Sequence, residues 1–127
     1  MSETQILLSA VLFLFVALYV RRKLQLRGVA MYTPAEVAER MKSAALLLDV
    51  RTGAERQRNS IRGSLHIPLH ELGRRMGELE KHKQKEIICY CQTGNRSLSA
   101  AAKLKKAGYR VANMSGGIVE WNSRGLR

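Results

Sequence analysis

The sequence of 127 residues has room for one domain of ordinary size and an appendage, which excludes a two-domain architecture. Its 22 lysines and arginines outnumber its 10 aspartates and glutamates, and the resulting net charge of +12 at pH 7 favours an anionic partner. The sequence has no zinc-finger spacing and no aromatic side chains interleaved with arginines, so we expect lipid and small anions as partners and no nucleic acid.

An uncharged apolar segment lies near the N-terminus. Residues 6–20 contain neither charge nor proline, and residues 1–5 form a short tail before them. Fifteen helical residues span only about 22 Å, so the arginines and lysine at 21–23 must extend the helix across the hydrocarbon layer of about 30 Å. We therefore expect one transmembrane helix over residues 6–23.

A secretory signal peptide is the main alternative for this segment, because signal peptides have apolar cores of similar length. Signal peptides begin with basic residues and end with small ones, whereas here Glu3 precedes the apolar segment and residues 21–23 are basic. By the positive-inside rule, this charge order predicts a single-pass protein of the inner or plasma membrane. Its N-terminus would lie outside and its C-terminal domain in the cytoplasm.

After a basic linker of residues 24–31, the sequence predicts a domain of residues 32–127. Its first helix starts at residues 33–36, where Thr33 is a hydroxyl N-cap, Pro34 occupies the first turn and Glu36 is placed for a capping box. The side chains spaced to face the core from this helix are Val37, Met41 and Ala44.

Two apolar runs, residues 45–50 and 86–91, predict parallel strands that are buried on both faces. Strands and helices alternate along the domain, so we expect an α/β fold with a central parallel sheet and helices on both faces. Asp49 and Cys91 lie at the ends of the two strands, where sheets of this class bind their ligands. The two side chains should therefore lie at one rim of the sheet.

The remaining elements follow from turn signals. The sequence predicts a short strand at residues 66–67, a helical region over residues 69–82 broken near two glycines, and a helix after Cys91 that ends at Gly108. A last strand over residues 109–114 and a terminal helix over residues 118–122 complete the domain. Trp121 on this helix should pack on the core.

The loop that begins at Cys91 carries the chemistry. Gly94 permits a tight turn, and the loop amides, the positive end of the following helix and Arg96 would lower the pKa of a thiol at its start. We therefore predict that Cys91 is a catalytic nucleophile assisted by Arg96, and that Cys89 is a small buried hydrophobe. The residues expected to bind substrate are Gln92, Thr93, Gly94, Asn95, Ser97 and Asp49.

Two cysteines at positions i and i+2 of one strand are poorly placed for a disulfide, which fits a reducing compartment. No metal site is predicted, because the cysteines are too few for zinc and Pro68 separates His66 from His70.

The loop resembles the active-site loop of rhodanese-type sulfurtransferases. The segments at residues 49–51, 61–68 and 116–121 also resemble signatures of that family, in its order and spacing. The resemblance covers about residues 32–127 and implies a sulfurtransferase. Such an enzyme would move a sulfane sulfur from a small anionic donor such as thiosulfate to a thiol or protein acceptor, through a persulfide on Cys91 and without a cofactor.

The resemblance also bears on alternatives and on structural residues. Four residues separate Cys91 from Arg96, as in the family's sulfurtransferases, whereas its phosphatases have one more. A non-catalytic sulfur-binding or scaffold module at the membrane remains an alternative, and a phosphatase is a weaker one. Arg51 and Glu55 resemble the family's buried ion pair, so we expect both to be structural, and Asp49 either caps its turn or helps to order the cysteine loop.

Overall fold

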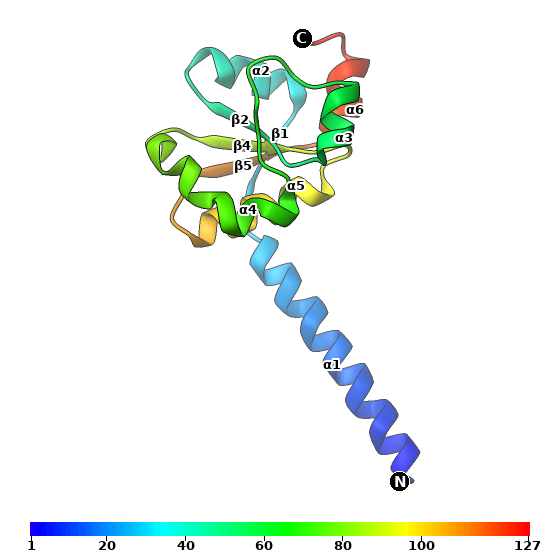
Figure 1. Cartoon of the computed structure of the whole chain (residues 1–127). Helices are drawn as coiled ribbons and strands as arrows, with labels where there is room; N and C mark the ends of the chain where they lie inside the picture. Colours follow the sequence, from blue (N-terminus) through cyan, green and yellow to red (C-terminus); the bar gives the residue numbers. More distant parts are fainter.

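A long helix followed by an α/β domain makes up the chain in this computed structural model, which describes residues 1–127 (Figure 1). Five parallel strands form one sheet in the order β1-β5-β4-β2-β3. The strands are β1 (Ala30–Tyr32), β2 (Leu46–Asp49), β3 (Leu65–His66), β4 (Ile87–Tyr90) and β5 (Val111–Met114). The helices are α1 (Glu3–Leu26), α2 (Pro34–Lys42), α3 (Gly53–Arg58), α4 (Leu69–Arg75), the 3-10 helix η1 (Met76–His82), α5 (Asn95–Lys106) and α6 (Gly117–Ser123).

Helices cover both faces of this sheet, as the alternation of elements predicts. Neighbouring residues of β2 point to opposite faces, so Leu47 joins the core beneath α2 and α6 while Leu48 joins the core beneath α4, η1 and α5. Strand β4 is buried along its whole length. The sheet is therefore a central layer that needs apolar residues on both sides, which explains the continuous apolar runs in the sequence.

Helix α1 is longer than the expected transmembrane segment. Ser2 caps it through a capping box with Gln5, so residues 3–5 are helical and do not form a tail. None of its residues is buried against the domain, and α1 projects away from the domain (Figure 1). Its 24 residues reach about 36 Å, enough to cross a bilayer core.

The predicted linker of residues 24–31 is wrong at both ends. Leu24–Leu26 belong to α1, and Ala30 and Met31 belong to β1, which pairs with β5 at the edge of the sheet. The domain thus begins before residue 32. Strand β1 has only three residues, of which the first two are exposed, so it lacks the long apolar run that marks the inner strands.

Helix α2 starts as predicted but ends sooner. The Thr33 side chain accepts a hydrogen bond from the Glu36 amide, and Pro34 is the first helical residue. No capping box forms, because the Glu36 carboxylate accepts from the Thr33 hydroxyl instead of the backbone. Val37 is buried and Met41 half-buried, but Ala44 is exposed, at φ 71°, beyond the end of the helix.

The turns predicted elsewhere in the domain are confirmed. The break between α4 and η1 falls between Gly73 and Gly77, and Gly108 follows α5 at φ 94°. Trp121 on α6 is buried in the core, as expected. β2 and β4 are adjacent and pair in register, so Asp49 and Cys91 come to one rim of the sheet.

Candidate active site

Cys91 directly follows β4, and its thiol is surrounded by the loop of residues 91–97, here called the cysteine loop. Gly94 at φ 110° turns the chain so that α5 starts at the next residue. The Gly94 amide then donates to the Cys91 Sγ at 3.1 Å, and the Ser97 hydroxyl lies 3.3 Å from the same sulfur. The residue is only 1% exposed, so the thiol is enclosed by these donors.

The two cysteines differ in acidity because they differ in hydrogen bonding. Burial alone would raise the pKa of Cys91, but the Ser97 hydroxyl and the amides of Ser97, Gly94 and Thr93 bring it below the ordinary thiol value. Cys89 has no such donors, and its burial raises its pKa to about 12. Only Cys91 is therefore set up to become a thiolate nucleophile.

Asn113, which was not among the predicted site residues, supports the cysteine loop from β5. Its side chain is buried; its Oδ1 lies 2.5 Å from the Ser97 hydroxyl, and its Nδ2 donates to the Gly94 carbonyl at 3.0 Å. A polar residue inside a strand of otherwise apolar residues was the available signal, because a buried amide needs hydrogen-bond partners.

The turn at Gly116 and Gly117 holds the start of the cysteine loop from the other side. The amide of Ile118 donates to the Cys91 carbonyl at 3.0 Å. A Cβ atom on Gly117 would lie 2.3 Å from the Gln92 carbonyl oxygen, and φ is +59° there. Glycine is thus required for close approach of two backbones and for the left-handed conformation.

Arg96 pairs with Glu55, which overturns the expected ion pair between Arg51 and Glu55. The Arg96 guanidinium donates two hydrogen bonds of 2.7 Å to the Glu55 carboxylate, one to each oxygen. Chiefly because of these bonds, the pKa of Glu55 falls to about 2, with help from the amide and hydroxyl of Thr52. The charge of Arg96 is therefore largely balanced by Glu55.

Arg51 instead points into the domain and pairs with Asp49. Its Nε and Nη2 atoms donate to the two Asp49 oxygens at 3.0 and 2.9 Å, and its remaining donors reach the Oδ1 and the carbonyl of Asn59. The backbone amide of Arg51 also donates to Asp49 Oδ1 at 2.9 Å. The bond from the Arg51 amide fits the predicted role of Asp49 as the cap of its own turn.

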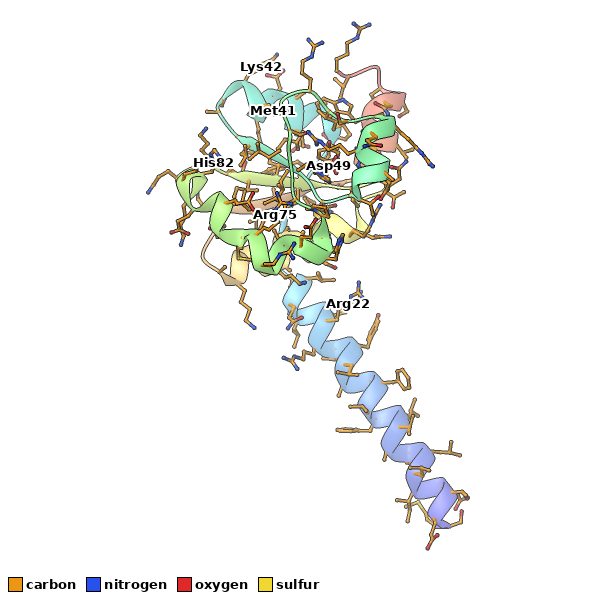
Figure 2. All side chains as sticks on the ribbon, viewed as in Figure 1. Arg22, Met41, Lys42, Asp49, Arg75 and His82 are labelled. Carbon is orange, nitrogen blue, oxygen red and sulfur yellow. The ribbon has the colours of Figure 1, made fainter.

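Asp49 is enclosed by protein groups, which argues against the predicted contact with substrate and favours a structural role. Its side chain is completely buried in the domain, where Figure 2 labels it. Arg56 donates to it at 3.2 Å and the Tyr90 hydroxyl at 3.0 Å, in addition to Arg51. These bonds outweigh the effect of burial and hold the pKa of Asp49 below its ordinary value, and a buried carboxylate needs such partners.

The other loop residues predicted to bind substrate surround Cys91 in different ways. Thr93 and Asn95 are exposed, whereas Gln92 is half-buried and its Oε1 lies 3.5 Å from an Arg51 nitrogen. The cysteine loop therefore presents backbone amides and the Ser97 hydroxyl to the sulfur. Its exposed side chains lie on the outer surface, where an incoming molecule would meet them.

Comparison with known proteins assigns this domain to a family. Residues 33–124 match the model of the rhodanese-like domain. The chain belongs to the rhodanese family. The expected fold class, a rhodanese-like central parallel sheet with helices on both faces and a long apolar helix before it, is thereby confirmed.

Relatives of this rhodanese-like chain include sulfurtransferases. A sulfurtransferase of Allochromatium vinosum is 42% identical over 82 residues, which are 64% of this chain and 75% of that protein. The structure of a rhodanese-related protein from Thermoplasma volcanium has a TM-score of 0.72 at 33% identity, and the match covers 77% of this chain and 95% of the other. Thiosulfate sulfurtransferase of Pseudomonas aeruginosa has a TM-score of 0.70 at 28% identity, covering 80% of this chain but 20% of that protein.

Proposed function

We propose that this rhodanese-like protein is a sulfurtransferase that works through a persulfide on Cys91. In the first step the Cys91 thiolate attacks the outer sulfur of thiosulfate, the sulfur–sulfur bond of the donor breaks, and sulfite leaves with the bonding electron pair. In the second step a thiophilic acceptor, such as cyanide or a thiolate, attacks the outer sulfur of the persulfide. The Cys91 thiolate is then regenerated.

The set of donors that surrounds the Cys91 sulfur is the observation that supports this function most strongly. The Ser97 hydroxyl and the amides of Thr93, Gly94 and Ser97 lower the pKa of a thiol that burial alone would make unreactive. The same groups are able to stabilise the negative charge on the outer sulfur of a persulfide, in the manner of an oxyanion hole. Their small ring suits one sulfur atom better than a tetrahedral phosphoryl group.

Arg96 has a different role in this proposal from the one expected of it. Because Glu55 balances its charge, its main contribution is to tie α3 to the cysteine loop. Coulomb attraction between Arg96 and a Cys91 thiolate adds a smaller contribution, since the thiolate contributes less to raising the Arg96 pKa than the Glu55 carboxylate does. Arg96 is thus chiefly a positioning residue.

The same proposal places the enzyme at a membrane. Helix α1 is long and apolar enough to span a bilayer, and its basic C-terminal end favours a cytoplasmic rhodanese-like domain in the inner or plasma membrane. Reduced cysteines, the donor and a thiol or protein acceptor would then share one reducing compartment. No nucleic acid takes part in this scheme.

Mass spectrometry of the full chain in detergent after exposure to thiosulfate tests the function. We expect a gain of one sulfur atom, about 32 Da, on Cys91 and none on Cys89. The variant Cys89→Ser should keep this gain and the transfer to cyanide, and Cys91→Ser should lose both. Transfer by Cys91→Ser would refute the mechanism, and no gain of sulfur by the unaltered chain would favour the non-catalytic scaffold instead.

A further inference from the structure

A basic groove lies where the C-terminal part of α1 meets α5, and sulfur transfer does not explain it. The groove has a volume of about 910 Å³, and its lining includes six cations and no acidic residue. Figure 2 shows Arg22 at this junction, on α1 just beneath the domain. The six cations of this basic groove are Arg21, Arg22, Arg27, Lys103, Lys105 and Lys106.

None of these six cations forms an ion pair, although ten ion pairs occur elsewhere in the protein. Lys105 alone has a hydrogen-bond partner, the Gly28 carbonyl at 2.7 Å, and it thereby ties α5 to the end of α1. Lysines in the last turn of α5 are favoured by the helix dipole. Arg21 and Arg22 lie before the last turn of α1 and Arg27 is its C-cap, so cations from two separate segments converge on the groove, which fits an anionic ligand.

Apolar side chains on the groove wall indicate what kind of anion fits. Leu18 belongs to the apolar part of α1, and together with Leu26 and Ala102 it lines the groove beside the cations. The groove therefore lies where α1 changes from apolar to basic, which is the depth of lipid headgroups for a membrane-spanning helix. A phospholipid matches both parts of the groove, because its phosphodiester pairs with the cations and its acyl chains contact the apolar side chains.

We propose that this groove binds the phosphate headgroup of an anionic phospholipid of the membrane that α1 crosses. The inference rests on the proposed membrane anchorage and not on sulfur transfer. The bound headgroup contacts cations at the end of α1 and on α5, and it thereby gives the domain a second attachment to the bilayer. The groove's lysines, Lys103, Lys105 and Lys106, lie in the C-terminal half of α5, whereas the cysteine loop lies at its N-terminal end, so a headgroup bound to these lysines leaves Cys91 free.

The test compares two double variants of the full chain reconstituted in nanodiscs of phosphatidylcholine with a minority of phosphatidylglycerol. Lys103→Gln with Lys106→Gln removes two charges from the groove, and Lys81→Gln with Lys85→Gln removes two exposed charges elsewhere. Spin-labelled phosphatidylglycerol reports the preference over spin-labelled phosphatidylcholine. We expect this preference to fall about tenfold in the first variant and to stay unchanged in the second.

An equal preference in both variants would overturn the proposal, because the basic end of α1 alone would then account for lipid selection. Inorganic phosphate provides a second arm, with the chain in neutral detergent. Binding of phosphate with the same dependence on Lys103 and Lys106 would assign the groove to a soluble phosphate and overturn the lipid source. Sulfur transfer from thiosulfate, measured in parallel, should be equal in both variants, and its absence throughout would refute only the proposed function.

Discussion

The Arg96 guanidinium and the Glu55 carboxylate face each other side by side, with Nη1 bonded to Oε1 and Nη2 to Oε2, each at 2.7 Å. This pair joins α3 to the cysteine loop, two segments that are 41 positions apart in the sequence. Both side chains are partly exposed, at 39% and 26%. The ion pair therefore holds the two segments together at the surface of the site.

Glu55→Gln should reduce the stability of the folded protein at pH 7 by no more than about 1 kcal/mol, since partly exposed ion pairs contribute little. The pKa of Glu55 is about 2 in the fold against an ordinary 4.5, so its contribution is complete above pH 4.5 and is lost as the pH falls towards 2. As the pH falls from 4.5 towards 2, the free energy of unfolding should therefore decrease less steeply in the variant than in the unaltered protein. Chemical denaturation at a series of pH values measures this.

Glu39→Gln is the matched control, because Glu39 forms an ion pair with Lys42 in which both side chains are 74% exposed. Its stability should follow the unaltered protein at every pH. A Glu55→Gln curve parallel to that of the unaltered protein would show that the pair with Arg96 does not control the acid dependence.

Ser97→Ala should slow alkylation of Cys91 by about tenfold at pH 7, because a hydrogen bond to a thiolate is lost. The pKa of Cys91 should rise, and the rate profile should move to higher pH. Asn113→Asp should act in the same direction, since a carboxylate near Ser97 repels the thiolate and cannot donate to the Gly94 carbonyl. The rate of iodoacetamide labelling against pH measures both effects in a Cys89→Ser background.

If Asn113 has only a structural role, Asn113→Asp should lower the stability of the fold and leave the pH profile of Cys91 labelling unchanged. Asn113→Asp therefore needs both measurements, and an unmoved profile would contradict its role as a positioning residue for the thiolate.

Gly117→Ala should destabilise the fold by about 1–3 kcal/mol or more and should slow labelling of Cys91. Its φ of +59° disfavours a side chain, and the new Cβ would meet the Gln92 and Cys91 carbonyl oxygens at 2.3 and 2.5 Å. Gly53→Ala is the control, since nothing lies within 4 Å of a Cβ there and the position is helical. Thermal unfolding should show no loss for the control, and equal losses would contradict the close-packed turn.

A reporter that is active only after export, fused behind Arg127, should stay silent, because residues 21–23 are basic and follow the apolar part of α1. Neutral residues at Arg21, Arg22, Lys23 and Arg27, with lysines at Ser2 and Thr4, should invert a fraction of the molecules. An export signal from the unaltered chain, or a mature protein that starts after Val20, would refute the cytoplasmic orientation.

Local signals in the sequence were sufficient for the two inner strands and for the start of α5, whereas α3, which carries Glu55, was not predicted. The apolar runs that end at Asp49 and Cys91 predicted two inner strands of the sheet, and Gly94 marked the turn into α5. Thr33 and Pro34 marked the start of α2. Each of these signals depends on interactions within a few residues of the chain or on burial of a whole segment, which the order of residues records directly.

Side-chain partners, by contrast, were decided only by the tertiary structure. Arg51 and Glu55 are four positions apart, yet one turns into the core to Asp49 while the other stays at the rim and meets Arg96. Asn113 reaches Ser97 because β5 lies between β1 and β4. The lateral order of strands brings these groups together, and no spacing along the chain encodes which distant segment becomes a neighbour.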